Sequence, residues 1–315
     1  MLNAFEVNDG ELQALAREEL PHRIRQALWL DLLAPSEDER RLVESLYPDM
    51  LPSAEEAREI EASSRFYEDA SGLHIHSFFL VEESGRPLNT TVAFTLGRDR
   101  LLSLREREIP VFRLVRQRIG HGTVAAADAA AVLITLFELH LDRLADRLQD
   151  IHAGLEETAL RVLSRNIERL DSAMAALAHF EDENGKVRLC LMDLQRGCVF
   201  LQRRGGLAEP QGERLRELLG DIDSLLPHSM FLFERVNFLL DAAQGFIQIR
   251  QNQIIKIFSV VAVIFLPPTL VASSYGMNFE FMPELTWPLG YPMAIGLMIA
   301  AAVVPYWYFR RKGWL

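Results

Sequence analysis

The sequence predicts an α+β domain that carries a long, coiled-coil-like helical arm and a stalk helix, followed by two C-terminal transmembrane helices. Three observations support this fold class. Strand-like and helix-like runs alternate over residues 1–120, and an apolar seam that repeats every 3.5 residues or so follows them. Within residues 257–309 the only charged side chains are Glu280 and Glu284, so two uncharged segments flank a short polar loop. That pattern is typical of a hairpin through a membrane.

Residues 1–256 form a distinctly acidic, soluble part. They hold 30 of the 33 Lys and Arg residues and 42 of the 44 Asp and Glu residues, a net charge of −12. Phosphate backbones bind to clustered positive charge, so nucleic acid is not an expected partner, whereas divalent cations suit an acidic surface. Residues 1–10 contain no apolar core of signal-peptide length, so we expect the soluble part to stay in the cytoplasm.

Residues 1–120 are expected to form a cytoplasmic α+β domain. Runs of apolar and β-branched residues predict strands at 27–33, 73–81, 90–96 and 101–104. Ser36 starts a helix with acidic residues in its first turn, and residues 53–63 show a similar pattern.

Metal ligands other than carboxylates are few in this sequence. His74 and His76 alternate in a predicted strand and so share one face, which could supply two ligands. Because no third ligand is near them in sequence, we favour histidines on the solvent face of the strand. Cys190 and Cys198 lack the spacing of a metal-binding pair and lie in a reducing compartment, so we interpret them as packing residues rather than a disulfide or metal site.

Residues 121–210 are expected to form a cytoplasmic helical hairpin arm. A coiled-coil-like seam follows one face of its first helix, at Phe137, Leu141, Leu144, Leu148, Ile151 and Leu155. Residues 186–202 supply the predicted return helix, and Gly205-Gly206 ends it.

Residues 211–256 are expected to form a stalk helix that continues into the first span. The helix starts near 211–213, and Pro227 predicts a bend or a boundary because proline removes one backbone donor and crowds the previous turn. Residues 231–272 contain no further stop signal before Pro267-Pro268. A helix that joins the two parts without a linker could transmit movement from the acidic domain to the membrane.

The membrane hairpin consists of a first span (257–275), a loop (276–290), a second span (291–309) and a basic tail (310–315). At 1.5 Å per residue each span covers about 28 Å, close to the thickness of the hydrocarbon layer. Basic residues flank the spans but are absent from the loop: Arg250, Lys256, Arg310, Arg311 and Lys312. Because cytoplasmic flanks carry the excess of Lys and Arg, both ends are predicted to be cytoplasmic and the loop to face outward.

One face of the first span is small and partly polar. Its residues recur by threes and fours: Asn252, Ile255, Ser259, Ala262, Leu266, Thr269 and Ser273. Two spans cannot enclose an aqueous pathway alone, so we expect copies of the chain around an axis to line a pore with this face. Close packing between helices is the alternative, because small residues also favour it.

The spans contain no Asp or Glu, which bears on the kind of ion that could pass. Hydroxyl, amide and carbonyl groups cannot easily strip Mg²⁺ of its water, but they can hydrogen-bond those waters. Asn278 offers an amide oxygen at the mouth of the pathway. Gly276 and Asn278 are equally well explained as the turn that ends the helix.

Several stretches resemble one protein family. Tyr275-Gly276-Met277-Asn278, the following Met282-Pro283-Glu284-Leu285 and the basic tail ending in Trp314-Leu315 are similar to the CorA family of magnesium and cobalt transport proteins. The resemblance extends over the chain and is closest to the proteobacterial branch at residues 59–63, 72–79, 186–193 and 265–272.

The resemblance implies a homopentameric funnel in the bacterial inner membrane that passes Mg²⁺, and also Co²⁺ and Ni²⁺, without an organic cofactor. The implied selectivity filter, at the periplasmic mouth, consists of Gly276, Met277 and Asn278. The implied pore-ring and gate positions are Asn252, Ile255, Phe258, Leu266 and Thr269, and the implied basic collar is Arg310, Arg311 and Lys312.

The resemblance also implies regulation by cytoplasmic Mg²⁺ at carboxylates between neighbouring protomers. The candidate ligands are Asp241 on the long helix, and Asp221 or Asp223 facing Glu68 or Asp69 across an interface. Bound Mg²⁺ would neutralise the facing acids and hold a closed state, and its loss would let like charges separate the subunits.

Three other classes of protein are alternatives. A zinc transporter of the same superfamily usually departs from the Met-Asn pairing and the acidic loop found here. An enzyme is disfavoured because the sequence has no phosphate-binding Gly-rich loop, no His-Glu-x-x-His and no convincing nucleophile with its base. A membrane-anchored coiled-coil scaffold would use the acidic arm but has no need of a polar stripe in its first span.

Overall fold

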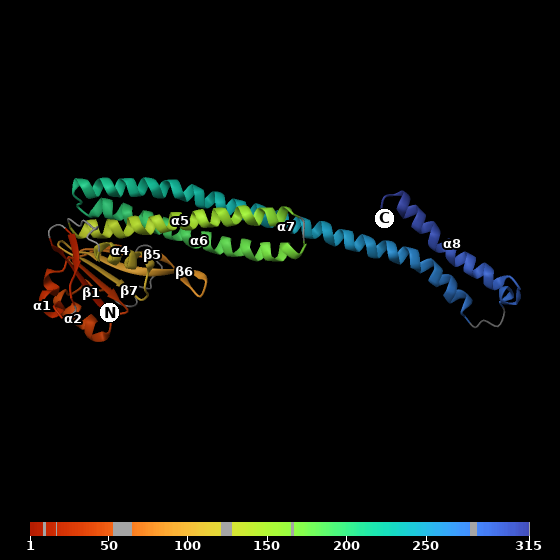
Figure 1. Cartoon of the computed structure of the whole chain (residues 1–315), viewed down its shortest axis with the longest axis horizontal. Helices are drawn as coiled ribbons and strands as arrows, with labels where there is room; N and C mark the ends of the chain where they lie inside the picture. The colour runs from red at the N-terminus through yellow and green to blue at the C-terminus, as the bar shows by residue number, and fades with distance from the viewer. Residues whose placement is uncertain are drawn as a thin grey trace. The chain divides into compact units, whose positions relative to one another are not determined.

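The protein is described here from a computed structural model that covers residues 1–8, 11–16, 18–52, 65–120, 128–164, 167–277 and 282–314. It divides into two compact units, Met1–Leu240 and Asp241–Leu315. Figure 1 labels the elements along the chain. The helix expected at 53–63 lies outside the described residues.

The described residues of the first unit form a seven-stranded mixed sheet with the order β2-β1-β3-β7-β6-β5-β4. Strands β3 and β7 are parallel, and the other neighbouring pairs are antiparallel. The strands are β1 Leu2–Asn8, β2 Glu11–Ala14, β3 Trp29–Leu33, β4 Phe66–Glu68, β5 Leu73–Glu83, β6 Arg86–Leu96 and β7 Leu101–Arg105. The four expected strands are confirmed with shifted ends, whereas β1, β2 and β4 were not expected.

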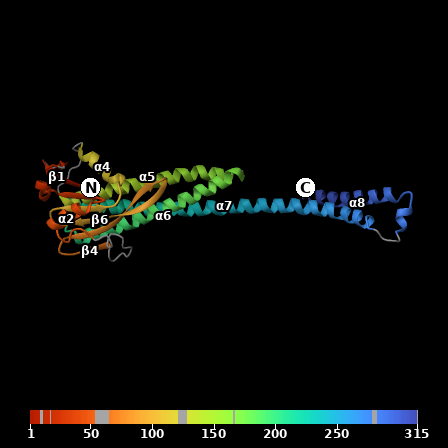
Figure 2. The same cartoon turned by 90° about the horizontal axis from the view of Figure 1, so that it is seen from below.

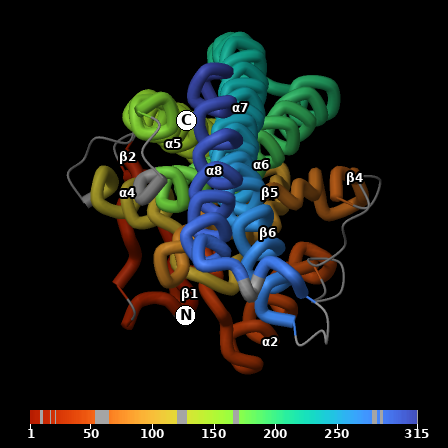
Figure 3. The backbone as a smooth tube through the Cα atoms, turned by 90° about the vertical axis from the view of Figure 1, so that its right-hand side faces the viewer, coloured from red at the N-terminus to blue at the C-terminus, as the bar shows by residue number. Residues whose placement is uncertain are grey.

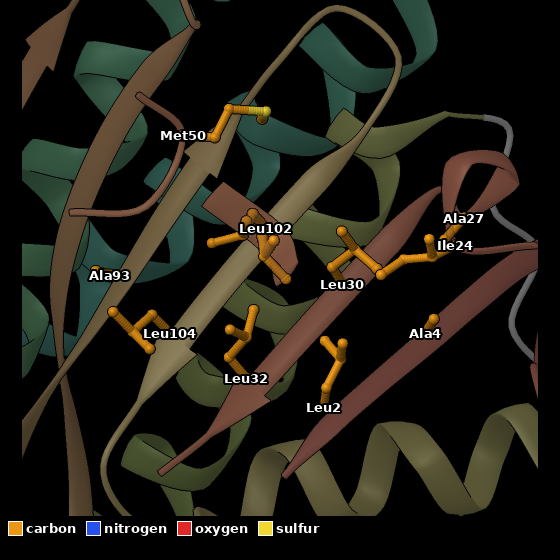
Figure 4. Packing of buried hydrophobic residues seen from close by; sticks show 11 residues of the cluster. Leu2, Ala4, Ile24, Ala27, Leu30, Leu32, Met50, Ala93, Leu102 and Leu104 are labelled. Carbon is orange, nitrogen blue, oxygen red and sulfur yellow. The ribbon is translucent and has the colours of Figure 1, made fainter. Parts of the chain in front are cut away.

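One face of the sheet is covered by α1 (Leu20–Arg23), η1 (Ile24–Gln26) and α2 (Glu37–Leu46). Figure 4 shows the aliphatic core on this side, which comprises Leu2, Ala4, Ile24, Ala27, Leu30, Leu32, Val43, Met50, Ala93, Leu102 and Leu104. The predicted start of α2 is confirmed by a capping box. The backbone N–H of Glu39 donates to Ser36 Oγ at 3.3 Å, and the N–H of Ser36 donates to Glu39 Oε2 at 2.9 Å.

The opposite face of the sheet carries an aromatic core. Successive strand residues point to opposite faces, so Trp29 lies on this side while Leu30 lies on the aliphatic side. Helices α4 (Pro110–Gly120) and α5 (Ala129–Leu163) contribute Phe112 and Phe137, whose rings lie 6.0 Å from Trp29 and 5.7 Å from Phe94 respectively. The sheet is therefore packed between helices on both faces.

Helices α5 and α6 (Ile167–Arg204) form the predicted arm and lie side by side in Figures 1 and 2. Every residue of the predicted α5 seam is buried, which confirms the seam. The return helix is longer than the predicted 186–202. Its earlier part continues the apolar spacing with Leu170, Ala173 and Leu177, all of which are buried.

Helix α7 (Glu209–Tyr275) is one continuous helix of 67 residues. The sequence predicted either a bend or a boundary at Pro227. A boundary is wrong, because the helix passes through this residue without a break. Proline costs the helix one hydrogen bond to the carbonyl of residue 223, and since Pro227 and Asp223 are both exposed, water can satisfy that carbonyl. The helix also continues through Pro267-Pro268.

Buried polar contacts attach the arm to its neighbours. Asp193 of α6 accepts hydrogen bonds from Ser77 Oγ at 2.9 Å and from the backbone N–H of Phe78 at 2.8 Å, which ties α6 to β5. Asn184 of α6 and Ser229 of α7 bond reciprocally, with the amide donating at 3.0 Å to the Ser229 carbonyl and the hydroxyl donating at 3.1 Å to the amide oxygen. These contacts fix the register of α6 against the sheet and against α7.

A fully buried ion pair links the two parallel strands. Arg105 of β7 contacts Asp31 of β3 with two nitrogens, Nε at 3.0 Å and Nη2 at 2.8 Å, and both side chains are 0% exposed. Ser103 Oγ also donates to Asp31 at 3.0 Å, and Trp29 Nε1 donates to Ser103 Oγ at 3.0 Å. The bidentate geometry and the extra donors compensate for the lost hydration of both charges.

We expect Asp31→Ala to lower the free energy of unfolding by about 3–5 kcal/mol, because the buried Arg105 guanidinium loses its bidentate partner and keeps only the contacts of Nη1 with Glu108 and the Arg107 carbonyl. Denaturant unfolding of the detergent-purified protein measures this change. Asp99→Ala is the matched control, since Asp99 is exposed and its loss should cost under about 0.5 kcal/mol. Equal stability of the two variants would contradict the role of the pair.

Candidate functional site

The second unit contains two apolar helices joined by a short connection. Both α7 and α8 (Gly290–Arg311) contain a segment long and apolar enough to cross a membrane, and only 6% of each segment is buried within the chain. The core helix of a soluble protein would be mostly buried, so this exposure favours spans that face lipid or other copies. Helix α8 returns next to the last part of α7 (Figures 2 and 3).

One face of α7 packs toward α8. The residues of its membrane part that are buried or half-buried lie along one face of the helix, at Lys256, Val260, Ile264, Pro267, Pro268, Val271 and Tyr275. The buried and half-buried residues of α8 include the small Ala294 and Ala301 beside the larger Ile295 and Met298. At the open end of the hairpin, Lys256 Nζ lies 5.8 Å from the centre of the Trp314 ring.

The predicted stripe lies on the other side of α7. Each residue turns an α-helix by about 100°, so Ala262, Leu266 and Thr269 lie about 180–240° around the axis from Val260. The same arithmetic places the remaining stripe residues and Phe258 between about 160° and 280°. All eight candidate positions are exposed in the single chain: Asn252, Ile255, Phe258, Ser259, Ala262, Leu266, Thr269 and Ser273. Packing between α7 and α8 therefore does not account for the small, polar character of this face.

The hydroxyl groups of the stripe are arranged as acceptors. Ser259 Oγ donates to the Ile255 carbonyl at 2.8 Å, and Thr269 Oγ1 donates to the Phe265 carbonyl at 2.8 Å. Each hydroxyl proton thus bonds to a carbonyl of the same helix, so no hydroxyl donor is left unpaired in apolar surroundings. The remaining lone pairs of each oxygen stay available to accept a hydrogen bond, such as one from a water molecule around a cation.

Helix α7 ends at the predicted loop. The backbone N–H of Gly276 donates to the Ala272 carbonyl at 3.0 Å, and that of Met277 lies 3.4 Å from the Ser274 carbonyl. A Cβ at Gly276 would lie 3.2 Å from the Ala272 oxygen, so a larger residue would crowd this tight end. Asn278 and Glu280 lie outside the described residues, while Glu284 is exposed in η3 (Pro283–Thr286).

The start of α8 depends on a glycine that the sequence reasoning missed. A Cβ at Gly290 would lie 2.2 Å from the backbone oxygen of Glu284, a distance that only a shift of the main chain could relieve. The N–H of Gly290 also donates to the Trp287 carbonyl at 3.0 Å. The backbones of η3 and of the first turn of α8 therefore pack directly against each other at Gly290. The sequence could have indicated this contact, because a glycine stands at the predicted end of the loop.

The basic residues of the tail lie where the predicted collar requires an accessible charge. Arg310, Arg311 and Lys312 are all exposed at the end of α8, and Arg311 lies over the Trp307 ring at 5.4 Å. Because Trp314 also contacts Lys256, the basic flanks of both spans lie at the same end of the hairpin. This placement is what the predicted orientation needs.

The predicted regulatory acids are separate in the single chain. Asp221, Asp223 and Asp241 are exposed along α7; Gln195 donates to Asp223 at 2.6 Å. Glu68 of β4 pairs with Arg204 at 3.4 Å. Within the described residues, no group of three or more His, Cys, Asp or Glu side chains could hold a metal ion.

Asp69 has a local role in the turn before β5. Its Oδ1 accepts from the Ser71 hydroxyl at 2.6 Å and from two backbone N–H groups, and it pairs with His74 Nε2 at 3.0 Å. Burial alone would raise the pKa of Asp69, but the bonds from Ser71 and His74 outweigh it and lower the pKa to about 2. The expectation that His74 and His76 face solvent is wrong, because both are 1% exposed beneath the sheet-covering elements.

The two cysteines lie within the helical packing. Cys190 and Cys198 are free and 0% exposed, so the prediction of packing residues is confirmed. Burial raises the pKa of both thiols, which makes them poor nucleophiles.

Known proteins resemble this chain over its whole length. Residues 25–311 match the family described as CorA-like Mg²⁺ transporter protein. The chain is 50% identical to the magnesium transport proteins CorA of Escherichia coli (strain K12) and of Sodalis glossinidius (strain morsitans), over 100% of each chain. It superimposes on the complete CorA magnesium transporter of Methanocaldococcus jannaschii with a TM-score of 0.79 and 19% identity, covering 100% of this chain and 99% of that one.

We expect Gly290→Ala to destabilise the hairpin by about 1–3 kcal/mol, the usual cost of overpacking, because the new methyl group would collide with the Glu284 backbone. Thermal unfolding in detergent, monitored by circular dichroism, checks the direction. Gly296→Ala lies on the same helix with nothing within 4 Å of its new Cβ, so it should be neutral or stabilising. A Gly290→Ala protein as stable as the Gly296→Ala protein would refute this packing.

Proposed function

The chain belongs to the CorA-like Mg²⁺ transporter family, and on this premise we propose that it carries Mg²⁺ across a membrane through a pathway shared by several copies. Its relatives are named as transport proteins, so transport rather than catalysis is the proposed activity, with no organic cofactor. The membrane potential drives entry, since moving a divalent cation inward gains about 4.6 kcal/mol per 100 mV.

The observation that carries the proposal is the exposed face of α7 opposite α8. Lipid-facing helices are apolar all round, yet Asn252, Ser259 and Thr269 share this one face. A single copy leaves these groups uncovered. Copies arranged around an axis bring the faces together, and the resulting channel is lined by oxygen acceptors with Ile255 and Leu266 as apolar constrictions between them.

The proposed selectivity depends on the water shell of the ion. Mg²⁺ gives up its waters reluctantly, so acceptors that bind those waters suit it better than carboxylates that replace them. Gly276, Met277 and Asn278 form the proposed filter, in which backbone oxygens and the Asn278 amide oxygen hold the hydrated ion. Co²⁺ and Ni²⁺ are proposed as further cargo.

The proposed assembly is a homopentamer in the bacterial inner membrane with both termini in the cytoplasm. The basic residues at one end of the hairpin, including the proposed collar Arg310, Arg311 and Lys312, support this orientation. Regulatory Mg²⁺ is proposed to bind between protomers through the exposed carboxylates Asp221, Asp223, Asp241 and Glu68. Asp69 is the weakest of these candidates, because donors of its own turn already occupy one of its oxygens.

We expect Asn278→Ala to reduce Mg²⁺ uptake by at least about tenfold, because one hydrogen bond to a charged or strongly polarised group contributes about 1.5–3 kcal/mol. Uptake into proteoliposomes with an imposed inside-negative potential measures the effect. Asn237→Ala, an exposed asparagine earlier in α7, is the control and should transport normally.

Two outcomes would contradict the proposal. If Asn278→Ala takes up Mg²⁺ at the full rate while size-exclusion chromatography shows an intact oligomer, the proposed selectivity filter is ruled out. Uptake of Zn²⁺ that Mg²⁺ does not inhibit would instead support the zinc-transporter alternative.

A further inference from the structure

A small polar cavity lies in the first unit, between β5, α4 and α5. Its volume is about 220 Å³, and its charged and titratable lining residues are Glu82, Glu108, Arg113, His140, Arg143 and Arg147. Sites for drug-sized ligands typically measure about 300–1,000 Å³. The cavity therefore suits a single small ion better than a nucleotide.

The two carboxylates of the cavity are already neutralised. Glu82 pairs with Arg147 at 3.0 Å. Glu108 pairs with Arg116 at 2.6 Å and with the buried Arg105 at 3.2 Å. Neither carboxylate is thus left to attract a cation or to repel an anion with its full charge.

Two arginines of the cavity have no charged partner among the described residues. Arg113 of α4 and Arg143 of α5 form no ion pair or side-chain hydrogen bond with any described residue, although the chain as a whole carries a net charge of −11. The N-terminus of α4 at Pro110, which also lines the cavity and has no acidic residue in its first turn, adds a partial positive charge. These groups together form an anion-binding environment.

His140 also lines the cavity, and its protonation state determines which hydrogen bond a ligand can form with it. It is 1% exposed, its ring stacks on Phe79 at 4.1 Å, and its Nε2 lies 3.0 Å from the Phe78 carbonyl oxygen. Burial, with a contribution from the charge of Arg143, lowers the pKa of His140 to about 3, so the ring is neutral and carries one proton.

The position of that proton follows from the partner of Nε2. A carbonyl oxygen only accepts, so Nε2 holds the proton and Nδ1 presents a lone pair. No described residue donates to Nδ1. The ligand best suited to this cavity therefore carries both negative charge for the arginines and a proton that it can donate to Nδ1.

We propose that this cavity is a binding site for inorganic hydrogen phosphate, held by Arg113 and Arg143 and donating its P–OH proton to His140 Nδ1. Sulfate offers the same charge without a proton at neutral pH. A phosphate monoester, with a second pKa of about 6, has also lost its last proton at pH 7.5. Inorganic phosphate retains a proton there, so His140 selects it. The site does not depend on the transport proposal.

Isothermal titration of the full-length protein in detergent, in phosphate-free buffer at pH 7.5, tests the site with inorganic phosphate. We expect Arg113→Gln and Arg143→Gln each to weaken phosphate binding by at least about tenfold, the loss expected for one charge-assisted hydrogen bond. Arg41→Gln, which removes an exposed arginine of α2 that has no described partner, should bind like the unchanged protein. Both arginines are exposed, and unchanged melting temperatures verify that the variants are folded.

Sulfate and methyl phosphate provide the second arm of the experiment. We expect both to bind at least about tenfold more weakly than inorganic phosphate, because neither donates a proton to Nδ1 at this pH. Binding of all three ligands with equal affinity overturns the proposal. Phosphate binding that is absent, or that either arginine variant leaves unchanged, also overturns it.

Discussion

The second unit depends on one constraint, which is that hydrocarbon supplies no hydrogen-bond partners. Helices α7 and α8 meet it by satisfying their backbone groups internally and by keeping charge out of the spans. The hydroxyls of Ser259 and Thr269 meet it by donating to their own helix. The same contacts leave oxygen lone pairs on the face away from α8. The bonds that satisfy these hydroxyls within the helix thus leave the acceptors that the proposed passage of a hydrated cation requires.

The first unit is held together by buried polar contacts rather than by apolar packing alone. Asp31 and Arg105 join the parallel strands, Asp193 joins the arm to the sheet, and Asn184 with Ser229 joins the arm to α7. Each of these contacts has a specific geometry, so the helices cannot slide without breaking it. Helix α7 belongs to this network through Ser229 and is unbroken to Tyr275.

The fold was largely predictable where one periodicity dominates. The seam of α5 follows a 3.5-residue apolar repeat and the spans are long uncharged apolar runs, and few other structures produce either pattern, so both could be identified from the sequence. Strands β1 and β2 were missed because they are short and polar residues interrupt their apolar pattern. Pro227 was misjudged because local preference predicts a break, whereas contacts on both sides of it, such as Ser229 with Asn184, hold the helix together. His74 was misjudged because sequence does not show that both faces of β5 are covered.

The candidate site could be predicted in part. Helical periodicity places the stripe on one face, but only the structure shows that α8 packs on the opposite face and leaves the stripe uncovered. The regulatory acids could not be located, because exposed carboxylates are common and a single chain does not bring them together. The proposed phosphate site had no sequence signal, since the residues that line its cavity come from separate elements of the chain and the proposed selectivity depends on the tautomer of a buried histidine.

If the face of α7 opposite α8 lines a water-filled pathway, as proposed, then a charged reagent should reach that face and not the face toward α8. Cysteine accessibility along α7 in native membranes, probed with a charged thiol reagent, measures this difference. The native cysteines are buried and should contribute little background. We expect rapid labelling of Ser259→Cys, Ala262→Cys and Thr269→Cys, and protection of Val260→Cys and Ile264→Cys. Labelling of the second set, or protection of the first, would contradict it.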